Sequence, residues 1–519
     1  MTQDRLERLG WPGLVFGVAL VLRLIGLGAR PFWLDEVFTL QRATLPPAKL
    51  VLDSFQNHHM PVYFLLLRPL TQLENFQFWL RFPSAVFGAG AVALVYIIAE
   101  RVGGRLSALL SALFLGLSPA SLAYSQEARS YTLIMMLILV GLYGVVRLAL
   151  DVPAAARPLR EGAERLGWGL FILGTAGAVD VLPDSLLWLM SANLIFAVMI
   201  AQAADRRGLA RNVLVANLII LALAAPLYAL LELFQLKGFV ATLAWVPPLD
   251  LARLWYSFGS VYFMHIADAT SFRLLDRGYQ VPLLVGVDVL LAAAVATAAW
   301  TLRRRPGVLA ALGLSFLVLP VALTLFSLWQ PVLVPRYIFW SAAPFSVLAG
   351  VGAAVALRRL RPWTRGLSVA GLAMVLTVNL AAYYQAETKP RWDLAAQMLA
   401  AEVAPGDVIY VPDLYGPKLL KVYLPPAKQD VLKTSLATDL PDAQAAMAQG
   451  KRVWSVYGVA GQTSDPRPKK ALYANIDALG TPVEVQVVGQ KILIVLNAPN
   501  AQSSNAQSSP CQVGQAGCS

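Results

Sequence analysis

Long runs of hydrophobic residues alternate with short polar stretches through the first three quarters of the chain. A helix that spans a bilayer needs roughly 17–25 mainly apolar residues. About eleven runs meet or approach this length, and several contain glycine or serine, which permit close helix packing in lipid. We expect membrane-spanning helices at 11–28, 82–98, 106–124, 131–150, 167–182, 186–204, 213–231, 281–302, 308–329, 337–357 and 366–384.

Arginine clusters occupy every second loop between these runs. If Arg5 and Arg8 lie on the inner side, the arginine-rich loops on that same side are 101–105, 157–165, 206–211, 303–305 and 358–365. Positive loops face the cytoplasm in membrane proteins. The formal net charge of +12 therefore reflects topology rather than nucleic-acid binding, and the other loops lie outside. The first run has no obvious small-residue cleavage site, so we expect it to be retained as a helix.

The apolar stretch 61–73 is the exception, because it is only about a dozen residues long and contains Arg68. If it crossed the membrane, every later arginine cluster would lie outside. We therefore expect an amphipathic helix on the outer surface. The first outer segment, 29–80, would then contain two surface helices, the first beginning near Asp35.

Composition changes after residue 385 and predicts three parts of the chain. Residues 1–385 form a transmembrane module, 386–497 a soluble α/β domain outside the cytoplasm, and 498–519 a disordered tail rich in small polar residues. In the soluble domain we expect a helix at 392–402 and strands at 407–411, 453–457, 483–488 and 491–496. The predicted fold is thus mainly α: a polytopic helix bundle with a small C-terminal α/β domain.

The tail holds the chain's two cysteines, Cys511 and Cys518. A disulfide between them is compatible with an oxidising compartment. No histidine or acidic residue stands beside them, which argues against a metal site there. The sequence does not indicate where residues 232–280 lie in the fold.

Acids and arginines gather in the loops that we place outside. Asp35 and Glu36 lie in the first outer segment, Glu127 and Arg129 in the next outer loop, and Arg336 at the start of the tenth run. A carboxylate can take a proton from an incoming hydroxyl, and arginine grips phosphate oxygens in a planar fork. This arrangement suits an enzyme whose substrate carries an anionic head on a lipid.

Each of these residues also has a structural interpretation. Asp35 and Glu36 suit the N-terminus of a helix, where the dipole favours acids. Glu127 and Arg129 could pair to cap the fourth span, and Arg336 could extend toward the interface.

Three further polar sites have equally plain explanations. Arg23, within the first span, is expected to snorkel outward, and Arg81 could anchor the second span. His58 and His59 are adjacent, and neighbouring side chains of a helix point apart. A polar interfacial patch is therefore favoured over a metal site.

Five sequence blocks occur in the order found in one enzyme family. They are Trp33-Leu-Asp-Glu36, His59-Met-Pro-Val-Tyr-Phe64, Leu80-Arg-Phe-Pro-Ser84, Tyr124-Ser-Gln-Glu-Ala-Arg-Ser-Tyr131 and Pro335-Arg-Tyr337. Over nearly all of residues 1–400 the chain resembles the bacterial family 39-like glycosyltransferases. These are relatives of the protein O-mannosyltransferases and aminoarabinose transferases, and the resemblance implies the membrane-embedded C-type glycosyltransferase fold.

The resemblance also implies roles for individual residues. Asp35 matches the general base, Glu36 a neighbour that supports the base or positions the acceptor, and Glu127 a second acid facing the same cavity. Substrate-binding positions are matched by Arg336, which would hold the carrier phosphate, and by Arg129, Arg81, His59, Tyr337 and Tyr63. Met60 replaces a family proline, which leaves the role of His59 open. Lys389 and Trp392 match a Lys-x-x-Trp block.

By this resemblance, we expect a sugar to pass from a polyprenyl-phosphate donor to a hydroxyl of a glycan, lipid or protein, with inversion. The reaction would occur on the periplasmic face of the bacterial inner membrane. No cofactor is expected: some members of the wider fold use a divalent metal, but no Asp-x-Asp motif occurs in either outer loop. The alternatives are a transporter or flippase for lipid-linked glycans, or a non-catalytic assembly subunit. Span centres almost free of charge favour an enzyme over a transporter.

Overall fold

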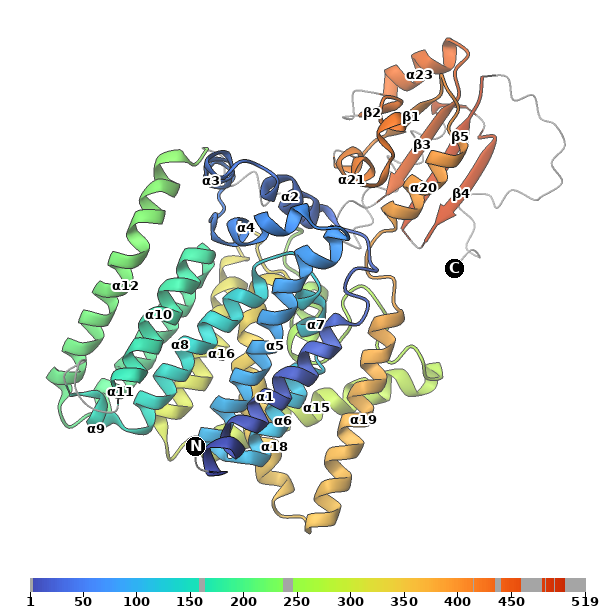
Figure 1. Ribbon diagram of the computed structural model, residues 1–519. Helices are drawn as coiled ribbons and strands as arrows, with labels where there is room; N and C mark the ends of the chain where they lie inside the picture. Colours follow the sequence, from blue (N-terminus) through green and yellow to red (C-terminus); the bar gives the residue numbers. More distant parts are fainter. Residues whose placement is uncertain are drawn as a thin grey trace. The chain divides into compact units, whose positions relative to one another are not determined.

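The structure is a computed structural model that forms two compact units (Figure 1). It describes residues 3–157, 164–236, 246–413, 415–434, 440–458, 478–480, 482–489 and 491–499. The helical unit comprises the chain up to Arg30 together with Phe38–Ala386. The mixed unit comprises the chain from Glu387 onward together with Pro31–Val37, a segment that the sequence analysis assigned to the first outer loop. Both cysteines lie outside the described residues.

The helical unit is built from long apolar helices joined by short connections. Their bounds are α1 Gln3–Leu24, α5 Phe76–Gly103, α6 Arg105–Gly116, α7 Pro119–Ser125, α8 Tyr131–Leu150, α9 Val152–Ala155, α10 Arg165–Val181, α11 Leu186–Gln202, α12 Arg206–Phe234, α14 Leu251–Tyr262, α15 Arg277–Leu302, α16 Pro306–Phe326, α17 Pro335–Ile338, α18 Ala342–Leu357 and α19 Pro362–Gln385, with 3-10 turns η2 Pro183–Ser185 and η3 Phe339–Ser341. Each of the eleven predicted spans coincides with a helix or with a pair of consecutive helices.

Within the described part of the chain, eight helices are long and apolar enough to cross a membrane. A ninth span results if α6 and α7, which are bent by 62° relative to each other, are counted as one. Two further predicted spans fall below this length: in α1 the apolar helical stretch is Gly10–Leu24, and α10 is 17 residues long. The chain is therefore a multi-span membrane protein, as predicted.

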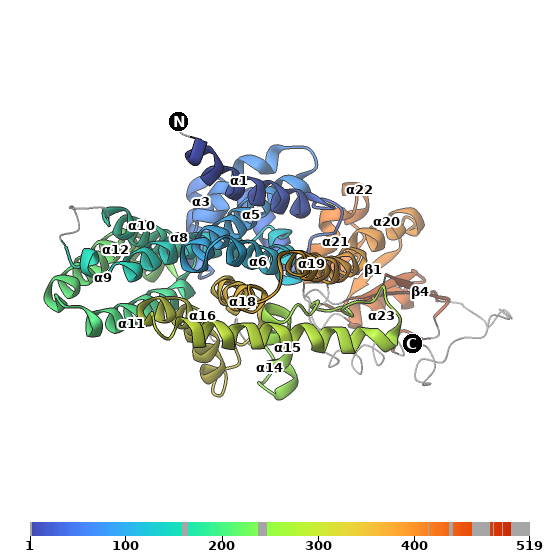
Figure 2. The same cartoon turned by 90° about the horizontal axis from the view of Figure 1, so that it is seen from below.

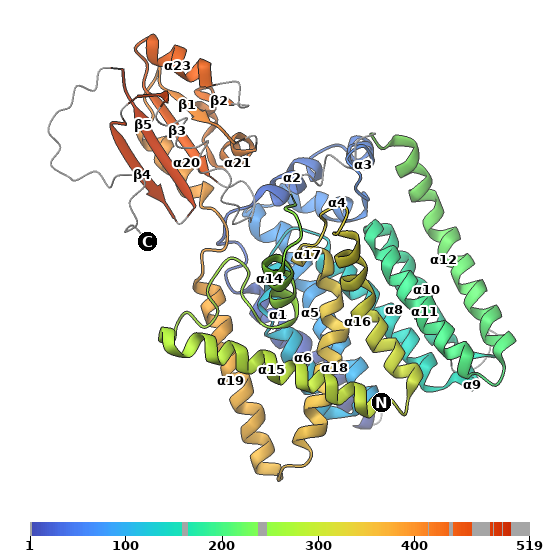
Figure 3. The same ribbon diagram turned by 180° about the vertical axis from the view of Figure 1, so that it is seen from behind.

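Glycines allow the helices to approach closely where they cross. A Cβ atom on Gly352 of α18 would lie 1.7 Å from the carbonyl oxygen of Ala294 on α15. Figures 2 and 3 show α15 crossing α18 steeply. Between α8 and α10, a Cβ on Gly144 would lie 2.4 Å from the Gly167 oxygen, and one on Gly174 would lie 2.5 Å from the Gly141 nitrogen. These contacts confirm the expected packing role of small residues.

Short helices cover one end of the helical unit. They are α2 Leu34–Ala43, α3 Pro47–Gln56, α4 Val62–Leu67 and η1 Arg68–Gln72. The α4–η1 pair matches the surface helix expected at 61–73, whereas α3 was not predicted. Figure 1 shows α3 and α4 at the opposite end from α9 and from the arginine-rich turn between α18 and α19. This separation agrees with the topology deduced from charge.

The mixed unit contains a five-stranded sheet in the order β2-β1-β3-β5-β4. The strands are β1 Val408–Val411, β2 Leu432–Thr434, β3 Val453–Gly458, β4 Glu484–Val488 and β5 Ile492–Asn497, and the helices are α20 Trp392–Glu402, α21 Gly416–Tyr423, α22 Pro426–Gln429 and α23 Leu440–Ala448. Strands β2, β1 and β3 are parallel, and β3, β5 and β4 are antiparallel. Helix α20 and four strands were predicted, while the three-residue β2 was not.

Alternate residues of β1 face opposite sides of the sheet. Val408 and Tyr410 pack with Ala443 and Ala446 of α23. Helix α20 lies on the other face of the sheet. The ring of its Trp392 is fully buried and lies beside Gly416, at the start of α21, and Gly458, at the end of β3. Helices on both sheet faces confirm the predicted α/β character.

Candidate active site

The loop between α7 and α8, residues 126–130, connects three polar groups of the helical unit. Ser118 caps the start of helix α7, because its hydroxyl accepts a hydrogen bond from the Ser121 nitrogen at 3.4 Å. The loop then turns sharply, because the backbone nitrogen of Arg129 donates a hydrogen bond to the backbone carbonyl oxygen of Glu127 at 2.8 Å. Glu127 is only 1% exposed, so this turn holds a carboxylate inside the protein.

The first group surrounds Tyr124, at the end of α7. Its ring centroid lies 5.4 Å from that of Tyr131 and 4.6 Å from that of Phe339. Tyr124 is within electrostatic reach of both Glu127 and Arg336. The structure thus gathers an acid and an arginine from two separate predicted loops. We call Tyr124, Glu127 and Arg336 the Tyr124 cluster.

Arg336 lies in the first turn of the short helix α17 and is half-buried. Its guanidinium carbon lies 5.5 Å from the centroid of the Tyr337 ring. Tyr256 of α14 is within electrostatic reach of Arg336, and its hydroxyl donates to Asp268 Oδ1 at 3.2 Å. Burial, with the Asp268 charge, raises the pKa of Tyr256, which therefore remains protonated. Helix α14 belongs to the stretch that the sequence analysis left unplaced.

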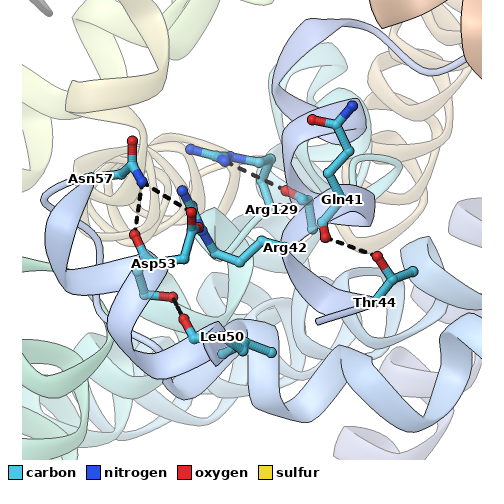
Figure 4. A network of polar contacts seen from close by, with 9 residues as sticks. Gln41, Arg42, Thr44, Leu50, Asp53, Asn57 and Arg129 are labelled. Carbon is cyan, nitrogen blue, oxygen red and sulfur yellow. Dashed lines mark hydrogen bonds and ion pairs between the residues drawn. The ribbon is translucent and has the colours of Figure 1, made fainter. Parts of the chain in front are cut away.

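The second group joins Arg129 to the short surface helices. Arg129 Nη1 donates to Thr39 Oγ1 on α2 at 3.5 Å, and Arg42 Nε donates to Asp53 Oδ2 on α3 at 2.6 Å. Figure 4 shows these two arginines reaching into the space between α2 and α3. Burial, together with the positive charges of Arg129 and Arg42, holds the pKa of His59 well below its usual 6.5. His59 is therefore neutral at neutral pH, and it can exchange hydrogen bonds but does not supply positive charge.

Tyr63 connects helix α4 to the same loop. Its hydroxyl is 2.7 Å from Ser84 Oγ on α5, and Ser84 Oγ donates to the Arg129 carbonyl oxygen at 2.9 Å. Through Ser84, hydrogen bonds thus link Tyr63 to the loop that carries Glu127 and Arg129.

The third group contains Arg81 and Arg23, both buried. Arg81 Nη1 donates to the carbonyl oxygens of Leu27 at 3.0 Å and Arg30 at 2.8 Å, and so fixes the chain after α1. Arg23 donates to Ser125 Oγ at 3.0 Å and to Ser121 Oγ at 2.7 Å. The expectation that Arg23 snorkels outward is therefore wrong. The two serines stand four residues apart on α7 and offer it hydroxyl acceptors inside the protein.

Gln126 and Tyr383 are polar residues that the sequence analysis did not single out as candidates. The Tyr383 hydroxyl donates to Gln126 Oε1 at 3.2 Å, and the Arg30 guanidinium lies 4.3 Å from the Tyr383 ring centroid. Tyr383 is also within electrostatic reach of Glu127 and Arg81. The end of α19 is thereby tied to the acidic loop, a link between residues 257 positions apart that no local pattern reveals.

Asp35 and Glu36 occupy the first turn of α2, in the part that belongs to the mixed unit. Glu36 is fully buried and its Oε2 lies 2.7 Å from Lys389 Nζ. Asp35, its neighbour, is half-buried. The Lys-x-x-Trp block thus meets the Trp-Leu-Asp-Glu block, although nothing in the sequence indicates that they touch.

The adjacent histidines face different partners. His58 Nδ1 lies 3.2 Å from Gln235 Oε1, whereas the His59 ring lies 6.0 Å from the Phe64 ring. In the described part of the chain, no three side chains of His, Cys, Asp or Glu gather in a way that could hold a metal ion.

Comparisons with solved structures identify the fold. ArnT from Cupriavidus metallidurans, bound to undecaprenyl phosphate, superposes with a TM-score of 0.53 at 16% identity, over 94% of this chain and 98% of that one. The oligosaccharyltransferase AglB from Archaeoglobus fulgidus, in complex with an inhibitory peptide and a dolichol-phosphate, gives a TM-score of 0.51 at 12% identity, over 86% and 69%. No family model and no curated protein matches the sequence. The chain has the C-type glycosyltransferase fold that the sequence resemblance implied.

Proposed function

We propose that this protein is an inverting glycosyltransferase. It takes a sugar from a polyprenyl-phosphate donor and passes it to an acceptor hydroxyl on the extracytoplasmic face of the bacterial inner membrane. The acceptor is a glycan, a lipid or a protein. Asp35 acts as the general base, Arg336 holds the donor phosphate, and Glu127 faces the reacting groups.

The observation that carries this proposal is the Tyr124 cluster. Buried Glu127 and half-buried Arg336 come from separate loops and lie within electrostatic reach of the same tyrosine. Charged groups are costly near a bilayer unless they are paired or used. The fold gives further support, because ArnT has been solved with undecaprenyl phosphate and AglB with a dolichol-phosphate.

The proposed reaction is a single displacement. The acceptor oxygen forms a bond to the anomeric carbon while the bond from that carbon to the phosphate oxygen breaks. The acceptor proton passes to the Asp35 carboxylate, and polyprenyl phosphate leaves with the bonding electrons. One displacement inverts the anomeric centre, so one base suffices.

Positive charge is needed where the leaving phosphate develops its negative charge. Arg336 fits this task, since a guanidinium can donate two parallel hydrogen bonds to phosphate oxygens. Arg129 and Arg81 add positive charge in the neighbouring groups. Because arginine can supply this stabilisation, the proposal includes no metal ion or other cofactor. His59 remains a neutral hydrogen-bonding group in this account.

Binding of the carrier lipid tests the role of Arg336. We expect Arg336→Met to weaken binding of undecaprenyl phosphate by about tenfold or more, because a charge-assisted bidentate contact is lost. Arg336→Lys should fall between this variant and the unchanged protein, since lysine keeps the charge but not the fork. Native mass spectrometry or a titration in detergent measures the affinity.

Arg359 provides the matched control. It is exposed in the turn between α18 and α19, at the other end of the helical unit. Arg359→Met should leave the affinity unchanged. If the Arg336 variants bind undecaprenyl phosphate as tightly as the unchanged protein, Arg336 does not hold the carrier.

A further inference from the structure

The segment that carries Asp35 is built into the C-terminal domain. Pro31–Val37 forms one compact unit with the chain from Glu387 onward. Helix α2 therefore starts in the mixed unit and ends in the helical unit. No local sequence pattern joins these parts, because the residues in contact are 353 positions apart.

An ion pair secures the end of this segment. Lys389 Nζ donates to Glu36 Oε2 at 2.7 Å, and the two side chains are only 5% and 0% exposed. The same Glu36 oxygen lies 3.5 Å from the Trp33 nitrogen, which donates to it across the first turn of α2. Removing one member of such a buried pair leaves an uncompensated charge, which is strongly destabilising.

A hydrogen bond secures the start of the segment. The Phe32 nitrogen donates to the hydroxyl oxygen of Tyr423, at the end of α21, at 2.6 Å. Phe32 is fully buried and Trp33 nearly so. Asp35 therefore stands between two fixed points, one three residues before it and the other directly after it.

We propose that Lys389 and Tyr423 are positioning residues that hold Asp35 in its working orientation. This inference rests on the proposed function only in taking Asp35 as the base. Lys389 acts through Glu36, and Tyr423 acts through the Phe32 backbone.

Amide hydrogen exchange in the full-length protein tests the positioning directly. We expect Lys389→Met to accelerate exchange across 32–37 by about tenfold or more, because the buried charge of Glu36 loses its partner. Tyr423→Phe is a milder change that removes only the hydroxyl. It should accelerate exchange at Phe32, with a smaller effect on the other residues of 32–37. Exchange in α8 and α18 should not change in either variant.

Arg452→Gln is the matched control. Arg452 Nη2 pairs with Asp407 Oδ2 at 2.6 Å in the same domain, where the two residues directly precede strands β3 and β1. This variant should leave exchange across 32–37 unchanged. If it accelerates that exchange as much as Lys389→Met does, the effect is general loosening of the domain, and the proposal is wrong.

The double variant Glu36→Gln with Lys389→Met tests whether the ion pair accounts for the effect of Lys389→Met. It removes both charges, so exchange across 32–37 should return most of the way toward that of the unchanged protein. If the double variant instead exchanged as fast as Lys389→Met, the ion pair would not be what holds this segment. That result would overturn the proposal.

Two functional measurements complete the test. Lys389→Met should lower the rate at which product glycan forms in cells by about tenfold to a hundredfold, because a small displacement of a catalytic group is costly. Binding of undecaprenyl phosphate should stay the same, since Arg336 belongs to the helical unit. Loss of product with unchanged exchange would contradict the positioning role. If Asp35→Asn kept full activity, the proposed function would fail, while the exchange results would still show whether Lys389 and Tyr423 hold the segment 31–37.

Discussion

At the scale of single residues, the charged side chains of this protein are held by specific partners. Glu36 pairs with Lys389, Arg42 with Asp53, and Arg23 lies between two serine hydroxyls. The types of these residues could be read from the sequence, but their partners could not. Partners that are 98 and 102 positions away leave no trace in spacing or periodicity, so Arg23 was wrongly expected to reach the interface.

Asp407 gives a pH-dependent prediction at this scale. Burial raises the pKa of Asp407, but hydrogen bonds from Arg452, the Ala404 nitrogen and Trp454 outweigh burial and leave its pKa below the usual 3.8. A carboxyl with a lowered folded-state pKa stabilises the fold above its unfolded pKa, and this contribution disappears as the pH falls through the folded-state value. The ion pair should therefore stabilise the C-terminal domain at neutral pH and cease to do so in acid.

Hydrogen exchange of β1 and β3 measures this effect in the full-length protein. At pH 7, Arg452→Gln should exchange faster than the unchanged protein in these strands, after correction for intrinsic rates. The difference should shrink as the pH falls below the usual value of 3.8 for aspartate. A difference that grows in acid would contradict this assignment.

At the scale of elements, the agreement between the predicted and the observed helices and strands depends on the length of each element. The long apolar runs became helices at every predicted place, because a bilayer requires continuous apolar helices. Short elements such as α3, α22 and β2 were missed, since three to ten residues carry little periodic signal. Their positions are set by tertiary contacts rather than by local pattern.

The crossing of α15 and α18 gives a prediction at this scale. A Cβ on Gly352 would lie 1.7 Å from the Ala294 oxygen, so the helices must separate to accept it. We expect Gly352→Ala to destabilise the protein by about 1–3 kcal/mol and to lower its melting temperature in detergent. Gly313 of α16 has open space around its Cβ position, so Gly313→Ala should leave the melting temperature unchanged or slightly higher. Equal melting of the two variants would contradict this packing.

At the scale of the whole molecule, the predicted fold is confirmed, but the grouping of the chain into units was not predicted. Composition separates an apolar module from a soluble domain. It gives no sign that Pro31–Val37 joins the soluble domain. Asp35, the proposed base, and Arg336, the residue proposed to hold the phosphate, thus belong to different units.

The proposed base is tested most directly by mass spectrometry of cell-surface glycans. The glycan that disappears when the gene is deleted would be followed in cells complemented with the unchanged protein, with Asp35→Asn, or with Glu74→Gln. Glu74 is an exposed acid in the same outer segment and serves as the control. The account predicts that the glycan returns with the unchanged protein and with Glu74→Gln, and stays absent with Asp35→Asn although that variant still binds undecaprenyl phosphate. Return of the glycan at the normal level with Asp35→Asn would contradict it.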